Sequence, residues 1–303
     1  MKINGPNKTL QCFPCFIRQM IDAARFTTDD PLVQERIIRN VLSKASEMDF
    51  QQSAPEVAQW VHRLIRSESG NSDPYLEGKR HSNEVMLRQF DYFKQLILES
   101  ASPWDTAVRI AIGGNTVDFA FRNSFTPEYI RETMQLALKQ PIFGVDDGQN
   151  GADPHPDVEM FRRDVESARS ILYVLDNAGE IVCDRVFIET LLPIDRTTAA
   201  VRGGPILNDA LMEDAAMVGL TDLLPVIHTG SDAPGVLLHD VNDEFREAYE
   251  SADLIIAKGL ANFETMVEYD RDIWFLFKAK CTVIADIVGE EIGSLVIRRN
   301  RAS

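Results

Sequence analysis

Five short apolar runs in the second half of the chain recur at an almost constant interval, and this regularity limits the fold more than any other feature. The runs begin at residues 171, 198, 226, 254 and 282, so that successive starts lie 27 or 28 residues apart. One strand, one crossover helix and two short loops fill such an interval, because a βαβ unit takes roughly 30 residues. The runs share no further residue signature, so we interpret the repeat as repeated topology and not as a solenoid.

Runs with so few polar positions are typical of a parallel sheet that helices cover on both faces. The first 170 residues show a different pattern, because their apolar residues recur at spacings of three and four, as in amphipathic helices. Helices are expected at 16–26, 33–49, 55–67, 83–100, 126–139 and 157–169.

These patterns predict an α/β protein with a Rossmann-like, doubly wound, mostly parallel sheet and an N-terminal helical domain. We expect a helical domain at 1–105 and an α/β metal-binding catalytic domain at 106–303, with a helical lead-in to about residue 170. The segment 145–156 concentrates Gly, Asp and Pro and is expected to be a loop or linker.

The charge balance argues against several classes of partner. The chain has 47 acidic and 31 basic residues, a formal net charge of −16, and no basic stripe, so we expect no nucleic-acid partner.

Its longest apolar stretches are far shorter than the roughly 20 residues of a membrane helix, so no membrane association is expected. Without a secretory pattern, and with only four cysteines, the chain is expected in the cytoplasm. Its oligomeric state stays open.

Polar residues follow each of the five runs. Asp176 and Asn177 follow the first, Arg202 and then Asp209 the second, and Lys258 ends the fourth. The third and fifth end in 228–235 and in Asp286. Because ligands bind at the carboxyl ends of parallel strands, we expect these side chains to gather at one edge of the sheet.

The chemistry of this set favours a hard cation. The oxygens of Asp176, Asn177 and Asp209 suit a divalent metal such as Mn, Mg, Ni or Co. Two aspartates alone would repel a phosphate, at about 4 kcal/mol per pair of charges ~4 Å apart, whereas a bound cation reverses the sign and acidifies a water. Lys258 and Arg202 can cover the remaining phosphoryl oxygens.

Our hypothesis for such a site is hydrolysis of a phosphomonoester, in which Asp176 or Asp209 orients or deprotonates the attacking water and Lys258 and Arg202 stabilise the transition state. A covalent aspartyl-phosphate at Asp176 stays an alternative. Glycines such as Gly203 let the backbone approach an anion.

Several ordered motifs resemble the domain-of-unknown-function 89 family, the metal-dependent damage-control phosphatases, over residues 10–298. The matching segments are 12–15, 73–84, 111–119, 176–184, 201–215, 228–235, 255–266 and 275–281. The resemblance implies a Rossmann-like domain behind a helical region, and phosphatase activity on sugar phosphates or damaged cofactor-related compounds. It implies a metal bound by Asp176, Asn177 and Asp209. It further implies a substrate pocket lined by Asn115, Asp118, Arg202, Ser231, Lys258 and Asn262.

Cys12 and Cys15 resemble a branch of this family with an N-terminal Cys-x-x-Cys. Their role stays open between packing and a metal or redox function, with His62 or His81 as conceivable partners.

Two rival functions also stay open. A nucleotide- or methyl-donor-dependent transferase could use the same sheet, although no phosphate-binding Gly motif follows the first run. A non-catalytic metal- or metabolite-binding protein could use the same pocket.

Overall fold

The computed structural model describes residues 6–116, 126–144 and 155–301, and a seven-stranded sheet forms its centre. The strands lie in the order β1-β7-β6-β5-β2-β3-β4. Their bounds are β1 Ile142–Phe143, β2 Ile171–Val174, β3 Thr197–Val201, β4 Val226–His228, β5 Leu254–Lys258, β6 Ile273–Lys278 and β7 Leu295–Asn300. Strands β2 to β6 run parallel, whereas β7 is antiparallel to β6 and pairs in parallel with β1 at the edge. The predicted mostly parallel sheet is confirmed.

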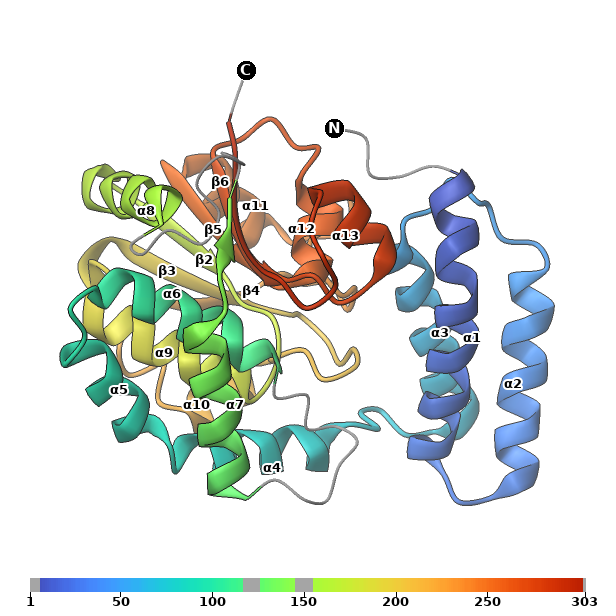
Figure 1. The fold of residues 1–303 in the computed structure, drawn as a ribbon. Coiled ribbons are helices and arrows are strands. Elements are labelled where there is room, and N and C mark those ends of the chain that lie inside the picture. The colour runs from blue at the N-terminus through green and yellow to red at the C-terminus, as the bar shows by residue number, and fades with distance from the viewer. Residues whose placement is uncertain (1–5, 117–125, 145–154, 302–303) are drawn as a thin grey trace.

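Helices cover both faces of this sheet (Figure 1). Those described are α1 Pro6–Thr27, α2 Pro31–Ala45, α3 Ala54–Ser69, α4 Leu76–Leu87, α5 Phe90–Leu98, α6 Pro103–Gly113, α7 Pro127–Lys139, α8 Pro156–Ser167, α9 Glu180–Leu191, α10 Met212–Met217, α11 Asp243–Ser251, α12 Leu260–Met266 and α13 Thr282–Val288, with short 3-10 helices η1 Gly114–Thr116 and η4 Ile194–Arg196.

Strand β2 shows why both faces are covered. Ile171 and Tyr173 belong to one hydrophobic cluster and Leu172 and Val174 to the other, because successive side chains of a strand point to opposite faces. The first cluster takes in helices α4 to α10, and the second takes in α11, α12 and α13. A strand buried on both faces has no polar position to spare, which explains its continuous apolar run.

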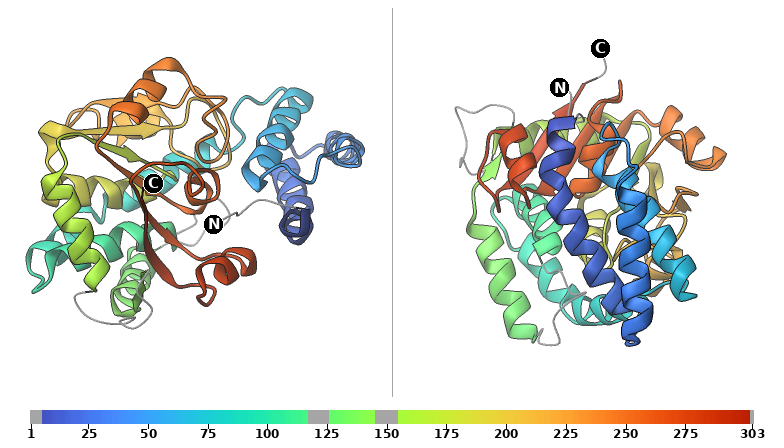
Figure 2. Two further views of the ribbon diagram at one scale, coloured as in Figure 1. Left: turned by 90° about the horizontal axis from the view of Figure 1, so that it is seen from above. Right: turned by 90° about the vertical axis from the view of Figure 1, so that its right-hand side faces the viewer.

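Helices α1, α2 and α3 form a third hydrophobic cluster and stand together at one end of the molecule (Figures 1 and 2). Helix α3 begins at a capping box between Ser53 and Glu56 and ends at Gly70, which has a φ of 70°. The division at residue 105 stays a prediction. Along the chain, Tyr75 is the last buried residue that packs in the cluster of α1, α2 and α3. Val85 of α4 packs in the cluster on the sheet.

The prediction of a strand at 282 is wrong. Residues 282–288 form helix α13, with Cys281 in the N-cap position, and the strand after β5 is β6. An apolar run of seven residues fits a buried strand or a short buried helix equally well, so its periodicity could not decide. Asp286 therefore lies on a helix and not at a strand end.

The helix predicted over 83–100 is two helices. Helix α4 ends at Leu87, and the N–H of Gln89 donates to the Met86 carbonyl at 2.9 Å, which closes a tight turn before α5. The side chain of Gln89 accepts a hydrogen bond from Arg131 of α7 at 2.8 Å, so a tertiary contact stabilises this break. The other predicted helices are confirmed within the described residues. The predicted loop at 145–156 lies outside them up to residue 154.

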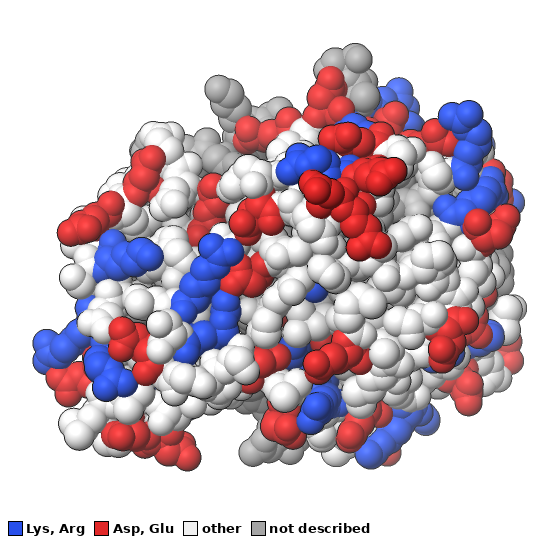
Figure 3. All heavy atoms as spheres, turned by 180° about the vertical axis from the view of Figure 1, so that it is seen from behind, with Lys and Arg blue, Asp and Glu red and all other residues white. Residues whose placement is uncertain are grey.

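The surface is mixed in charge where the molecule is seen from behind. Figure 3 shows basic side chains interspersed with acidic ones across that face. Among the described residues, no helix combines the length and the apolar character that crossing a membrane requires.

Buried His62 of α3 is expected to make the protein less stable in mild acid. Burial lowers the pKa of His62 from 6.5 to about 4, Arg66 lowers it further and Asp232 opposes the shift. The unfolded chain therefore binds more protons between about pH 6.5 and pH 4, and stability falls as the pH drops through this window, by up to about 3 kcal/mol. Urea unfolding at pH 7 and pH 4.5 should show a smaller pH difference for His62→Gln than for the wild type. An unchanged difference would contradict this assignment.

Candidate active site

The polar residues after β2 and β5 meet at the point where the chain changes direction across the sheet. From β2 the chain adds β3 and β4 on one side, and then returns to add β5 and β6 on the other. Asp176 and Asn177 follow β2, and Gly259 follows β5. Gly259 has a φ of 78°, and a Cβ there would lie 1.9 Å from Oδ2 of Asp176, so only glycine fits. In doubly wound sheets this position is the usual ligand crevice.

A second loop brings Asp209 beside Asp176. The N–H of Ala210 donates to the Asp176 carbonyl and the N–H of Ala178 to the Asn208 carbonyl, both at 2.8 Å, which makes an antiparallel bridge between Asn177 and Asp209. The predicted pair of acidic residues from separate strand ends is thus held together by backbone hydrogen bonds.

Arg202 connects the two carboxylates. Its Nε donates to Oδ2 of Asp209 at 2.7 Å, and its Nη2 lies 3.7 Å from Oδ1 of Asp176 and donates to Asn262 at 3.1 Å. The side chain is buried, and its Nη1 has no hydrogen-bond partner among the described residues. Arg202 therefore retains an N–H donor for an anionic ligand.

Two asparagines surround Asp176. The side-chain nitrogens of Asn115 and Asn177 donate to Oδ2 of Asp176 at 2.9 and 2.8 Å, and both also donate to Glu180. Burial, together with Glu180 and Asp209, raises the pKa of Asp176 well above its usual range. Burial also raises the pKa of Asp209, against the opposing effect of Arg202.

This crowding of buried acids suits a bound cation. No group of three or more His, Cys, Asp or Glu side chains is arranged to hold a metal ion in the part of the chain that the structure describes. A metal at this point would therefore need the amide of Asn177 besides Asp176 and Asp209. Two carboxylates and an amide are a donor set for Mg²⁺ or Mn²⁺, so the residues fit such an ion.

Lys258 is buried beside Glu180 and takes part in an ionic network. Its Nζ donates to Glu180 and Asp184 at 2.7 Å each and to the Ala111 carbonyl at 2.8 Å, and Tyr173 also donates to Asp184. All three N–H groups of the ammonium therefore have protein acceptors. Burial acts to lower the pKa of Lys258, but Asp184 and Glu180 outweigh it and raise the pKa, whereas burial raises the pKa of Asp184 to about 6. Contact between Lys258 and a substrate stays a prediction.

The sequence reasoning missed Glu180 and Asp184. Both are buried on α9, where they lie four residues apart within an otherwise apolar segment. Acidic residues that interrupt an apolar helix at this spacing share one face and need a buried cation. That signal was present in the chain.

Lys280 is the second residue that the sequence reasoning missed. It follows β6, it is exposed, and its charge lies close enough to lower the pKa of Asp176. It is a solvent-accessible cation near Asp176, whereas Lys258 is buried.

The remaining predicted residues make hydrogen bonds or close backbone contacts in the segments after β3, β4 and β5. Asn262 donates to the Leu175 and Lys258 carbonyls at 3.2 and 2.7 Å, and it also accepts from Arg202. Ser231 donates to Asp240 at 2.6 Å in the loop after β4. Gly203 passes so close to the Gly230 backbone that a Cβ would lie 2.4 Å away. Asp118 lies outside the described residues.

Asn83 of α4 links the motif at 73–84 to the site. Its side-chain oxygen accepts from the Gly179 N–H and its nitrogen donates to Asp214, both at 2.7 Å. Helix α4 thus holds the turn between Asp176 and α9 in place.

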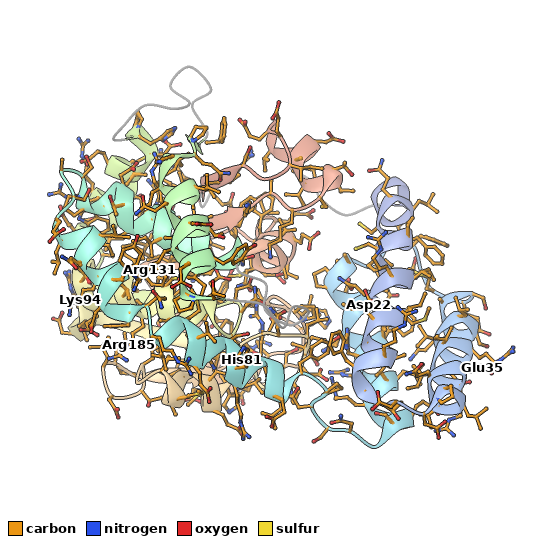
Figure 4. All side chains as sticks on the ribbon, turned by 60° about the horizontal axis from the view of Figure 1, so that its bottom comes forward. Asp22, Glu35, His81, Lys94, Arg131 and Arg185 are labelled. Carbon is orange, nitrogen blue, oxygen red and sulfur yellow. The ribbon has the colours of Figure 1, made fainter. Side chains whose placement is uncertain are left out.

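The two N-terminal cysteines have Glu264 and Cys281 as neighbours. Burial, followed by Glu264, Cys281 and Cys15, raises the thiol pKa of Cys12 to about 11. His62 lies instead with Arg66 and Asp232, and His81 lies on α4, apart from the start of α1 (Figure 4). A role for this pair stays a prediction.

The chain is similar to known proteins over almost its whole length. The damage-control phosphatase ARMT1-like domain matches residues 9–296. The chain belongs to this family. Curated relatives include an uncharacterized protein of Methanocaldococcus jannaschii, 34% identical over 98% of this chain and 97% of its own, and a damage-control phosphatase of Pyrococcus horikoshii, 34% identical over 96% and 97%. A damage-control phosphatase of Archaeoglobus fulgidus is 30% identical over 95% and 97%.

A solved structure supports the same membership in the ARMT1-like family. The crystal structure of a DUF89 family protein from Pyrococcus horikoshii superposes with a TM-score of 0.83 at 31% identity, covering 96% of this chain and 98% of that one. The expected resemblance to the domain-of-unknown-function 89 family is confirmed, and with it the fold.

Proposed function

We propose that this ARMT1-like protein is a metal-dependent phosphatase that hydrolyses small phosphorylated metabolites, namely sugar phosphates or damaged cofactor-related phosphomonoesters. The phosphatase names of two relatives support the reaction class. The observation that carries the proposal is Arg202, a buried cation that spans Asp176 and Asp209 and keeps Nη1 without a partner among the described residues.

Asp176, Asn177 and Asp209 would hold the cation, which is Mn, Mg, Ni or Co. When bound, it polarises the phosphoryl group and lowers the pKa of a water molecule. Arg202 donates from Nη1 to a phosphoryl oxygen, and Lys280 covers an oxygen on the solvent side. Asp176 or Asp209 orients the attacking water and accepts its proton. Lys258 acts through the network that orients Glu180.

The proposal places the enzyme in the cytoplasm, where thiols stay reduced. All four cysteines are free, which suits such a compartment.

We also propose that Cys12 and Cys15 mark the Cys-x-x-Cys branch of the family.

A panel of phosphorylated metabolites tests the function directly. Phosphate release should need added Mn, Mg, Ni or Co and should stop with a chelator, and the preferred metabolite identifies the substrate class. Release that continues at full rate in the chelator would contradict metal dependence. Saturable binding of a phosphometabolite without any release would favour the non-catalytic alternative, and release only with a nucleotide or methyl donor would favour a transferase.

Lys280→Ala is expected to weaken substrate binding more than catalysis. Since Lys280 is exposed, its loss should raise KM by about tenfold, the value of one charge-assisted hydrogen bond, with kcat changed less. Steady-state kinetics at several ionic strengths would measure this. Lys139→Ala, an exposed lysine on α7, is the matched control and should leave KM unchanged. A normal KM in the Lys280 variant would contradict its contact with substrate.

A further inference from the structure

The loop that carries Asp209 has an unfavourable backbone conformation. Leu207, two residues before Asp209, has a φ of 46°, and it is the only residue besides glycine with positive φ in the described chain. A bulky side chain in this left-handed region is strained and stays there only when its surroundings hold it. Leu207 lies inside a tight turn, which the Asp209 N–H closes by donating to the Ile206 carbonyl at 3.1 Å.

The contacts that hold this turn come from the N-terminal helices and not from the sheet. Leu207 packs against the hydrophobic cluster of α1, α2 and α3, and it is the only residue of the α/β part in that cluster within the described chain. Arg66 of α3 donates from Nη1 to the Pro205 carbonyl at 2.6 Å. The cluster of α1, α2 and α3 therefore contacts the loop on both sides of Ile206, at Pro205 through Arg66 and at Leu207 through apolar packing.

Arg66 also ties this loop to the next one. Its Nη2 pairs with Asp232, in the loop after β4 that carries Ser231. The Arg66 side chain is 17% exposed, so the two planar donors of its guanidinium bridge the loops largely away from water. The neighbouring Arg63 is 51% exposed and pairs with Asp232 and Asp240 but with no atom of the 203–210 loop. Two arginines one turn apart on α3 thus differ in whether they reach the Asp209 loop.

We propose that α3 is part of the catalytic machinery, because Arg66 and Leu207 act as positioning residues that set where Asp209 stands. The helical N-terminal unit then completes the site instead of only adjoining it. The effect on metal binding rests on the proposed function, whereas the effect on the loop does not.

Hydrogen exchange of the full-length chain tests the loop without reference to any activity. In Arg66→Ala, the amides of Asp209 and Ala210, which are both hydrogen-bonded, should exchange at least about tenfold faster, while the amides of α9 keep their rates. Arg63→Ala should change neither. Equal rates in Arg66→Ala and the wild type, or equal acceleration by Arg63→Ala, would overturn the proposal.

Titration with Mn²⁺ alone, by calorimetry, tests the consequence for the site. Arg66→Ala should raise the Kd for Mn²⁺ by about 10- to 100-fold, as expected for loss of a residue that orients a ligand, and Arg63→Ala should leave it within about twofold. An unchanged Kd in Arg66→Ala would overturn the positioning of Asp209. If the wild type binds no Mn²⁺ and releases no phosphate, the proposed function fails, and the exchange rates still decide the role of α3.

Leu207→Gly provides a second variant that does not depend on Arg66. Glycine removes the packing against α1–α3 and also relieves the strain at φ 46°, so the fold should tolerate it. The proposal expects faster exchange at Asp209 and weaker Mn²⁺ binding in spite of the relieved strain. Ile38→Ala, in the same cluster but away from the loop, controls for a general loss of stability. Equal effects of the two variants would show a merely structural role.

Discussion

Asp176→Asn is expected to lose activity by at least about 10³-fold in kcat while the protein remains folded, because the change removes a side chain that we propose both to bind the metal and to orient the water. Burial and the carboxylates of Glu180 and Asp209 raise the pKa of Asp176, which means that its ionised form is unfavourable in the folded protein. A neutral amide relieves this repulsion. The variant should therefore be as stable as the wild type or more stable, as happens when a functional charge is removed.

Phosphate release and urea unfolding, measured on the same preparation, check both halves of this expectation. Asp253→Asn is a control in which an exposed carboxylate loses its pairing with Arg169 on the surface, and it should change neither quantity appreciably. Retained activity in Asp176→Asn would rule out its role as a ligand. A large loss of stability would instead show that the repulsion is absent.

Lys258→Met is expected to destabilise the protein by about 3–5 kcal/mol, because it leaves the carboxylates of Glu180 and Asp184 buried without a cation. All three side chains are buried, with Lys258 0% and Glu180 1% exposed, so water cannot replace the lost partner. Urea denaturation at pH 7 measures the effect. Lys280→Met, an exposed lysine near the same site, should change stability by less than about 0.5 kcal/mol.

A triple variant separates a structural role of Lys258 from a catalytic one. Combining Lys258→Met with Glu180→Gln and Asp184→Asn removes the unpaired charges and should recover part of the lost stability. If Lys258→Met instead lowered kcat without lowering the free energy of unfolding, Lys258 would act on the substrate, as the sequence predicted, and the network would contribute little.

The strands of the sheet could be predicted from the sequence because they consist almost entirely of apolar residues. A strand buried on both faces needs apolar side chains throughout, and the strands β2 to β5 start within one residue of their predicted positions. The prediction failed where length could not distinguish strand from helix, at residues 282–288, and where a tertiary contact ended a helix, at Gln89.

The proximity of Asp176, Asn177 and Asp209 could be predicted from the chain because these residues follow successive strands, and the topology of a parallel sheet brings strand ends together. Asp176, Asn177 and Asp209 do meet in the structure. The sequence could not predict which residues pair with Lys258 and which with Lys280, because the two residues are both lysines. Only the fold buries one between Glu180 and Asp184 and leaves the other in solvent.

The sequence by itself determined the fold class and the side chains offered at the ends of β2, β3 and β5, since the burial of these strands follows from local apolar patterns. The tertiary structure alone decided which charges neutralise one another and which face outward. It also decided that α3, more than a hundred residues before Asp209 in the chain, supports the loop that carries it. Ion pairing and loop support depend on contacts between distant segments, and no local pattern records those contacts.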